Sequence, residues 1–271
     1  VRKDIYIATK TGSTTVEGFW KDLETSLNNL KTDYIDIYQF HNPSFCPKPG
    51  DGTGLYEAML EAKAQGKIHF IGLTNHRLPV AIEACESGLY DTIQFPFSYL
   101  ADQKDIDLVN KCKENNIGFI CMKALSGGLI NRSDAAYAYL AQFDNVLPIW
   151  GIQKESELDE FISYQTKAPE LTKEIQELIE HDRKELAGDF CRGCGYCMPC
   201  PKGIQINQCA RMSLMLRRAP AASWINEHWQ AEMKKIEECL NCGKCMQHCP
   251  YHLNTPELLK KNYEDYKTFL K

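Results

Sequence analysis

The sequence of 271 residues predicts an α/β barrel-type parallel sheet followed by a small, mostly helical, cysteine-rich domain. Short apolar runs alternate with amphipathic segments from residue 1 to about residue 166, the pattern of a parallel sheet covered by helices. Eight of the 13 cysteines then form two groups of four near the end of the chain. We expect a barrel-like domain over residues 1–168, a linking helix over 169–189 and the cysteine-rich domain over 190–271. A chain of this length can bury one large core and a small second domain.

Six short apolar runs are expected to be the strands. Near-continuous apolar runs suit parallel strands that are covered on both faces. The segments between them carry apolar residues at steps of three and four, as amphipathic helices do; examples are Val16, Phe19, Leu23, Leu27 and Leu30, and Ile106, Val109 and Cys112. The expected strands are Asp4–Lys10, Tyr34–His41, Ile68–Asn75, Thr92–Phe97, Ile117–Lys123 and Val146–Gly151.

The sheet is expected to be of the barrel type rather than an open, doubly wound sheet. A doubly wound sheet usually carries a glycine-rich turn after its first strand, and the segment 10–14 has only one glycine. Polar residues instead follow successive strands, and in a barrel these strand ends share one mouth where sites assemble. The polar residues at the strand ends are Lys10, His41, Thr74, Asn75, Gln94 and Lys123.

Four further helices are expected after the strand-rich part. The segment Glu170–Ala187 is amphipathic, and Gly188 is expected to end it. The others are Gln205–Arg218, Ser223–Glu238 and Glu257–Leu270.

The cysteine spacing predicts two [4Fe-4S] clusters. The quartets are Cys191, Cys194, Cys197 and Cys200, followed by Pro201, and Cys239, Cys242, Cys245 and Cys249, followed by Pro250. In paired-cluster ferredoxins three close cysteines hold one cluster and the fourth crosses to the other. The expected sets are therefore Cys191, Cys194, Cys197 and Cys249 for the first cluster, and Cys239, Cys242, Cys245 and Cys200 for the second. One departure is that two residues, not three, separate Cys197 from Cys200.

Zinc and disulfides are the alternative uses of these cysteines. Four-cysteine zinc sites usually stop at two pairs and add no third ligand at the same step. Disulfides need an oxidising compartment, and the first residues lack a secretory signal pattern. We therefore favour iron-sulfur clusters and expect a reducing, cytoplasmic location.

Charge and hydropathy exclude two classes of partner. The net charge is −5 and no basic stripe is present, so nucleic acid is not an expected partner. No apolar run approaches the roughly 20 residues that span a bilayer, so we expect no membrane segment.

Several runs resemble the aldo-keto reductase family. They are Ile7–Lys10, Asp33–Pro43, Gly66–His76, Gln94 after Asp91–Ile93, Gly127–Leu129 and Pro148–Ile152. With the cysteine quartets, the chain resembles the iron-sulfur branch of that family, whose members carry a ferredoxin-like tail. The resemblance implies an eight-unit barrel in which Lys10 closes the third strand. We therefore expect an N-terminally truncated barrel that lacks its first two units; the alternatives are a genuine six-unit open sheet or completion by a partner chain.

The resemblance also implies catalytic residues. In the family a nicotinamide cofactor supplies hydride, and a tyrosine, assisted by aspartate, lysine and histidine, protonates the carbonyl oxygen. Lys10 would lower the pKa of that tyrosine, and His41 would orient the carbonyl oxygen. The aspartate and tyrosine would fall upstream of residue 1. Residues 1–271 alone are therefore expected to form a poor reductase.

The implied cofactor is NADP(H) or NAD(H). Thr74, Asn75 and Gln94 match positions that hold the nicotinamide carboxamide, although Asn75 could instead cap the following helix. Met122, beside Lys123, stands where many relatives place a stacking tyrosine. The phosphate-binding regions correspond to the loop with Gly127 and Gly128 and to the segment from Gly151 that includes Lys154.

Two functions follow from these expectations. The first is an oxidoreductase that acts on a small carbonyl or alcohol substrate and uses the clusters for electron transfer. The second is a scaffold whose clusters pass electrons to a redox partner protein. A third possibility is that the clusters have a structural role and stabilise the C-terminal domain without changing redox state.

Overall fold

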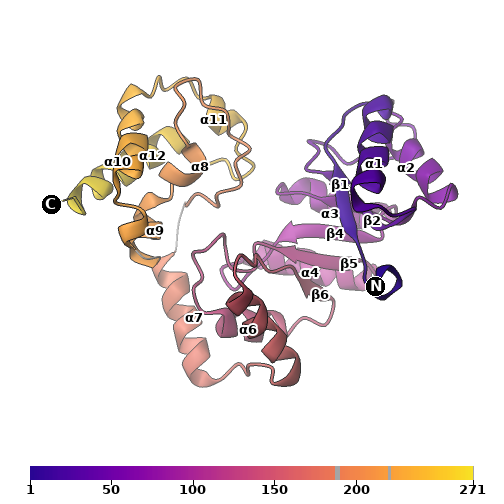
Figure 1. The fold of residues 1–271 in the computed structure, drawn as a ribbon, viewed down its shortest axis with the longest axis horizontal. Coiled ribbons are helices and arrows are strands. Elements are labelled where there is room, and N and C mark those ends of the chain that lie inside the picture. The colour runs from indigo at the N-terminus through magenta and orange to yellow at the C-terminus, as the bar shows by residue number, and fades with distance from the viewer. Residues whose placement is uncertain (187–189, 219–220, 271) are drawn as a thin grey trace. The chain divides into compact units, whose positions relative to one another are not determined.

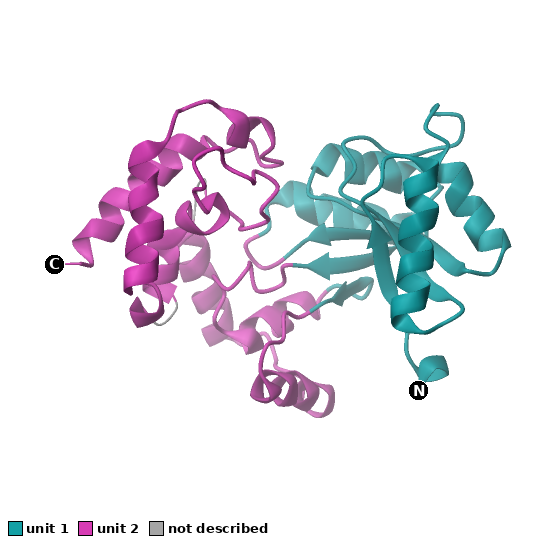
Figure 2. Ribbon diagram, turned by 45° about the horizontal axis from the view of Figure 1, so that its top comes forward, with its two compact units in different colours: residues 1–97, 101–122, 143–149 teal, residues 98–100, 123–142, 150–271 magenta. Residues whose placement is uncertain are grey.

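The computed structural model describes residues 1–186, 190–218 and 221–270. The chain divides into two compact units (Figure 2). Unit 1 comprises residues 1–97, 101–122 and 143–149, and unit 2 comprises residues 98–100, 123–142 and 150–271. Segments 98–100, 123–142 and 150–168, which we expected in the barrel-like domain, are thus grouped with the cysteine-rich part of the chain.

Unit 1 contains a six-stranded, wholly parallel sheet. Its strands are β1 (Ala8–Thr11), β2 (Ile35–His41), β3 (Ile68–Thr74), β4 (Thr92–Pro96), β5 (Gly118–Met122) and β6 (Val146–Pro148). They lie side by side in sequence order, β1-β2-β3-β4-β5-β6. A doubly wound sheet would reverse its strand order at a switch point, so the barrel-type order is confirmed. Among the described residues, β1 pairs only with β2 and β6 only with β5.

The predicted start of the first strand is wrong. We expected a strand from Asp4, but Arg2–Asp4 is a short 3-10 helix and β1 begins at Ala8. The Ile7 N–H donates to the Asp36 carboxylate over 2.8 Å, and Arg2 pairs with the same carboxylate at 2.9 Å. Side chains therefore take the place of strand pairing at this end of the chain.

Helices α1 (Val16–Leu30), α2 (Leu55–Ala64), α3 (Leu78–Ser87) and α4 (Gln103–Glu114) pack on the sheet and on their neighbours (Figure 1). The α1 stripe is buried at its centre through Phe19, Leu23 and Leu27. Val16 and Leu30, expected on the same face, are 38% and 43% exposed because they stand at the two ends of the helix. The apolar periodicity therefore identified the buried face and overestimated its length.

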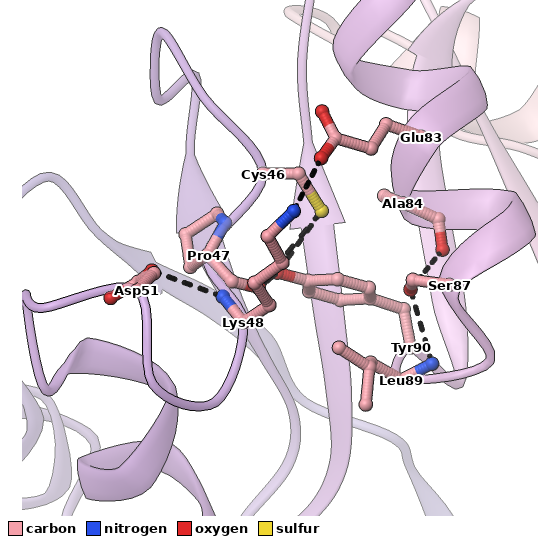
Figure 3. A network of polar contacts seen from close by, with 9 residues as sticks. All are labelled: Cys46, Pro47, Lys48, Asp51, Glu83, Ala84, Ser87, Leu89 and Tyr90. Carbon is pink, nitrogen blue, oxygen red and sulfur yellow. Dashed lines mark hydrogen bonds and ion pairs between the residues drawn. The ribbon is translucent and has the colours of Figure 1, made fainter.

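The loop after β2 is held against α3 by polar contacts (Figure 3). The Tyr90 hydroxyl donates to the Pro47 carbonyl oxygen at 2.5 Å, and the Lys48 ammonium pairs with Glu83 of α3 at 3.2 Å. Asp51 accepts a hydrogen bond from the Lys48 N–H at 3.1 Å. These contacts give a long loop a defined course beside the carboxyl ends of the strands.

Unit 2 is helical in its described residues. Its α-helices are α5 (Ser133–Leu140), α6 (Glu155–Thr166), α7 (Lys173–Glu185), α8 (Ile206–Cys209), α9 (Met212–Arg218), α10 (Glu227–Lys234), α11 (Lys244–Gln247) and α12 (Thr255–Thr268). The predicted helix 170–187 is confirmed as α7, and the predicted final helix as α12. Ala187 and the predicted stop at Gly188 lie outside the described residues. Residues 223–238, expected as one helix, divide into α10 and the 3-10 helix Lys235–Glu238.

The predicted single helix Gln205–Arg218 is wrong, because the chain breaks between α8 and α9. Asn262 of α12 donates to the Ala210 carbonyl oxygen at 3.1 Å and accepts from the Ser213 N–H at 2.8 Å. Its side-chain amide satisfies backbone groups that a continuous helix would pair internally. A residue about 50 positions away thus sets this break.

A buried ion-pair network joins α7 to α9 inside unit 2. Arg218 pairs with Asp182 and with Glu185, both at 2.7 Å, and donates to the Leu129 carbonyl oxygen at 2.9 Å. The Tyr99 hydroxyl donates to Asp182. Burial alone would raise the pKa of Asp182, but the hydrogen bonds from Arg218 and Tyr99 hold it below its ordinary value. These contacts attach loop segments around Tyr99 and Leu129 to the cysteine-rich part of the chain.

No helix among the described residues is both long and apolar enough to cross a membrane.

Candidate functional site

Five of the predicted site residues lie on one face of the sheet, at the carboxyl ends of its strands. Lys10 pairs in register with Gln39, and His41 with Thr74. Paired residues and residues two apart on a strand share a face, so these side chains point the same way. Thr74 in turn pairs with Gln94, and Gln94 with Ile120, two residues before Met122. The five residues are Lys10, His41, Thr74, Gln94 and Met122.

The five side chains form an outer and an inner group. Lys10 and His41 are exposed, whereas Thr74, Gln94 and Met122 are buried. The Met122 sulfur lies 4.0 Å from the Thr74 hydroxyl and 3.8 Å from the Gln94 amide nitrogen. The arrangement places two exposed ionisable groups on the same sheet face as a buried hydroxyl and a buried amide.

The Lys10 charge acts on His41. Both side chains reach solvent, but neighbouring protein atoms partly desolvate them. Partial desolvation lowers the pKa of His41, and the Lys10 charge lowers it further. Partial desolvation also lowers the pKa of Lys10. His41 is therefore a neutral imidazole near pH 7, which presents one N–H donor and one acceptor nitrogen.

Asn75 uses its side chain inside the protein. It is fully buried; its amide nitrogen donates to the Pro43 carbonyl oxygen at 2.8 Å, and its amide oxygen accepts from the Arg77 N–H at 2.8 Å. Arg77 directly precedes α3, so Asn75 builds the turn that leads into this helix. The predicted cofactor contact would have to use the remaining amide hydrogen or the second oxygen lone pair.

Sequence reasoning missed Gln39 and Thr92 on the same face. Gln39 is 1% exposed, and its amide oxygen and the Thr92 hydroxyl have no hydrogen-bond partner among the described residues. A Cβ at Gly72 would lie 2.4 Å from that hydroxyl and 2.9 Å from the Gln39 Cγ, so only glycine leaves both side chains room. The signal was available: Gln39 is polar inside an apolar run and stands two residues before His41.

The remaining predicted cofactor residues belong to unit 2. Lys123, Gly127 and Gly128 have positive φ, at 60°, 67° and 91°, and shape a tight loop in which the Ser126 N–H donates to the Lys123 carbonyl oxygen. Gly151 is exposed, and Lys154 caps the start of α6.

In the predicted phosphate-binding segment, the Glu157 carboxylate already occupies the backbone N–H donors. The N–H groups of Gln153 and Lys154 donate to the Glu157 carboxylate at 2.7 and 3.2 Å. These backbone bonds hold the pKa of Glu157 below its ordinary value. A nucleotide phosphate bound here would have to share or displace that carboxylate.

The eight quartet cysteines line two cavities within unit 2. Cys191, Cys194, Cys197 and Cys249 line one. Cys200, Cys239, Cys242 and Cys245 line the other, which Cys197 also borders. Each cavity thus combines three cysteines of one quartet with the last cysteine of the other. In the described residues, no three His, Cys, Asp or Glu side chains are grouped closely enough to hold a single metal ion.

The cavity walls suit a group larger than one ion. Gly193, Gly195 and Gly243 have positive φ, from 66° to 84°, so the loops turn tightly around the sulfurs. Burial raises the pKa of Cys191, and it raises that of Cys197 to about 12. Such thiols are neutral in the bare protein, and only a bound cationic metal core would hold them as thiolates.

Family models match both parts of the chain. The aldo/keto reductase family matches residues 1–137, and the 4Fe-4S dicluster domain matches residues 190–254. All eight quartet cysteines lie in the second of these regions.

Among curated relatives, a methylglyoxal reductase DkgB from Salmonella typhi is 37% identical over 118 residues, covering 39% of this chain and 42% of the relative. An NADH-specific methylglyoxal reductase from Escherichia coli is 31% identical over 114 residues, covering 42% and 35%. The chain thus spans less than half the length of these two relatives.

Solved structures give the same fold. The aldo-keto reductase AKR11C1 from Bacillus halodurans, in its holo form, superposes with a TM-score of 0.56 at 21% identity and covers 67% of this chain and 73% of that chain. At this identity the likeness concerns the fold alone.

Proposed function

Because this chain belongs to the aldo/keto reductase family, we propose that it forms part of an NAD(P)H-linked oxidoreductase that interconverts a small carbonyl compound and its alcohol. The observation that carries the proposal is the shared sheet face of Lys10, His41, Thr74 and Gln94 at the strand ends. Two similar proteins are named methylglyoxal reductases, which favours a small aldehyde or ketone as substrate.

Lys10 and His41, which we call the rim residues because they lie at the carboxyl ends of the strands, would act on the carbonyl oxygen. A bound nicotinamide supplies the hydride, and the carbonyl oxygen then gains negative charge that donors must stabilise. The neutral His41 ring donates an N–H to that oxygen and orients it. The Lys10 charge favours the developing anion and lowers the pKa of the group that delivers the proton.

Cofactor binding would use the buried polar groups. The Thr74 hydroxyl and the Gln94 amide supply a donor and an acceptor for the carboxamide of the nicotinamide, with Met122 against both. Lys123, Gly127, Gly128, Gly151 and Lys154 are proposed to contact the rest of the nucleotide. Similar proteins include one named for NADH and one for NADP(+), so the proposal covers both nucleotides.

The crossed cysteine sets are proposed to hold two [4Fe-4S] clusters. Cys191, Cys194, Cys197 and Cys249 would hold the first, and Cys200, Cys239, Cys242 and Cys245 the second. The grouping of these thiols around two cavities supports the proposal. Cysteine is also the usual ligand of iron-sulfur clusters, which it binds as a thiolate. All 13 cysteines are free, in keeping with a reducing compartment such as the cytoplasm.

A second candidate function is electron transfer to a partner protein without carbonyl chemistry. Cys242 is exposed, and its neighbour Leu240 is 61% exposed. The second cluster would therefore come close to the surface, where a redox partner protein could reach it.

The test is purification without oxygen, followed by iron and sulfide analysis and by assays with NADPH, NADH and methylglyoxal. We expect about eight irons per chain from two four-iron clusters and nucleotide oxidation that depends on the carbonyl compound. Stoichiometric zinc would refute the clusters. Clusters that pass electrons to an acceptor protein, without any carbonyl-dependent nucleotide oxidation, would favour the second candidate.

A further inference from the structure

Arg211 is a buried arginine whose hydrogen bonds within the described part of the chain all go to neutral groups. It stands between α8 and α9 and is 8% exposed. One terminal nitrogen donates to the Gly127 carbonyl oxygen at 2.7 Å. The Nε and the other terminal nitrogen donate to the Gln208 side-chain oxygen at 3.2 and 3.1 Å.

The neighbouring arginines are paired with carboxylates, and Arg211 is not. Arg217 pairs with Asp265, and Arg218 with Asp182 and Glu185. Among the described residues, no carboxylate lies within ion-pairing distance of Arg211. An isolated charge inside a protein is strongly unfavourable unless a counter-charge compensates it. The bare polypeptide therefore lacks an anion that this position calls for.

The guanidinium lies directly against the first cysteine loop. A Cβ on Gly193 would meet its atoms at 2.9 and 3.0 Å, and a Cβ on Gly127 would also meet it at 2.9 Å. Both glycines have positive φ, so the backbone approaches the guanidinium from two sides. Gly193 stands between Cys191 and Cys194, which line the first cavity.

We infer that Arg211 is the buried counter-ion of the cluster held by Cys191, Cys194, Cys197 and Cys249, and that it raises that cluster's reduction potential. The inference rests on the proposed cluster assignment. A four-iron core with four thiolates is an anion, and it becomes one charge more negative when it accepts one electron. A fixed cation in a poorly hydrated site stabilises the reduced form more than the oxidised form.

Arg211 approaches the first cysteine loop without lining the first cavity itself, and the described residues that line the second cavity include no buried cation. The cations of the second cavity, Lys202 and Lys244, are exposed, and Lys202 pairs with Glu238 at 3.5 Å. Water and salt screen exposed charges, so their influence on a cluster is weaker. In the first cavity Arg192 adds a half-buried cation that stacks on Tyr251. The two clusters are therefore expected to differ in potential, with the first the easier to reduce.

The experiment is a potentiometric titration of the oxygen-free holoprotein, followed by EPR and iron analysis, on wild type and three variants. Arg211→Gln removes the charge, Arg211→Lys keeps it, and Arg217→Gln is the control, because it removes a charge from a more exposed ion pair outside both cysteine cavities. For Arg211→Gln we expect about a tenfold fall in the reduced-to-oxidised ratio of one cluster at fixed potential, which is about 59 mV for one electron. Arg211→Lys should retain most of the wild-type ratio.

Loss of charge can also prevent assembly of the first cluster. Arg211→Gln would then lose about four of its irons, and Arg211→Lys should restore them. The inference is overturned if Arg211→Gln matches wild type, if Arg211→Lys behaves like Arg211→Gln, or if Arg217→Gln gives the same shift. A wild-type protein without four-iron clusters would instead refute the proposed function, so the two failures are distinguishable.

Discussion

The sheet rim of unit 1 and the cysteine cavities of unit 2 are built in different ways. At the rim, hydrogen-bonded strand register sets which side chains share a face, and Lys10, His41 and Thr74 follow from it. In the cavities, loops with positive-φ glycines bring together cysteines that are distant in the sequence, such as Cys200 and Cys239, 39 positions apart. Regular secondary structure therefore positions the first site, whereas the second depends on loops and on whatever the sulfurs bind.

The two regions should also differ in what stabilises them. The sheet rests on a buried apolar core that includes Phe19, Tyr38, Leu73 and Phe119. The cysteine-rich part is small, and small domains usually need metals or cross-links in addition to their core. Metal loss should therefore affect the two regions unequally.

The largest expected effect comes from removing a cluster ligand. Cys194→Ala leaves three thiols in the first cavity, and we expect the loss of about four of about eight irons. Hydrogen exchange should then increase around residues 190–218 and stay unchanged in β2 and β3. Cys112→Ala, which alters a buried cysteine of unit 1, is the control and should keep all its iron. An unchanged iron content in Cys194→Ala would contradict the assignment of Cys194 as a cluster ligand.

The next largest effect is expected at the rim. Lys10→Met removes the charge beside His41, and kcat/KM for carbonyl reduction should fall about 10²–10⁴-fold, the usual range for acid-base groups. Steady-state kinetics on the active holoprotein measure this change. Lys104→Met, on the exposed side of α4, should leave kcat/KM unchanged. Equal activity of the two variants would remove Lys10 from the mechanism.

A smaller effect is expected for the ion-pair network of unit 2. Asp182→Ala leaves Arg218 without its buried partner, and such losses cost about 3–5 kcal/mol. Asp144→Ala breaks an exposed pair with Lys113, and it should cost less than about 1 kcal/mol. Denaturant unfolding followed by the visible absorption of the clusters compares the two. A similar cost for both variants would show that the network adds little to stability.

The contribution of the same network to the free energy of unfolding should decrease at acidic pH. The pKa of Asp182 is below the ordinary carboxyl value of 3.8, so its unfolded form binds a proton first as pH falls. Its stabilisation is therefore complete above that ordinary value and disappears as pH falls through the lowered pKa. Asp182→Asn should show a flatter dependence of unfolding free energy on pH than wild type in this acidic range.

The smallest expected effect is a change in the pH profile of kcat/KM. Protonated Lys10 is the active form, so activity should fall as pH rises through its lowered pKa, below 10.5. Neutral His41 is the active form, so activity should fall as pH drops through its lowered pKa, below 6.5. In Lys10→Met the residual activity should lose the alkaline limb, and its acid limb should move to higher pH because the Lys10 charge no longer opposes protonation of His41. An unmoved acid limb would contradict the coupling of these two groups.

Much of unit 1 was predictable because its signals are local. Apolar runs marked all six strands, and polar residues at their ends marked Lys10, His41, Thr74 and Gln94. The start of β1 was not predictable, since Asp36 and Arg2 take over the backbone contacts there. For Asn75 the sequence offered a local role at the start of the following helix, and its oxygen does accept from the Arg77 N–H there; its bond to the distant Pro43 carbonyl oxygen was not predictable.

By itself, the sequence determined the order of strands and helices, the polar strand ends and the two cysteine quartets, since each is a pattern of neighbouring residues. Only the tertiary structure decided where Asn262 divides α8 from α9 and which buried arginine lies against Gly193. Those features depend on contacts between distant residues, which packing selects and local spacing does not record.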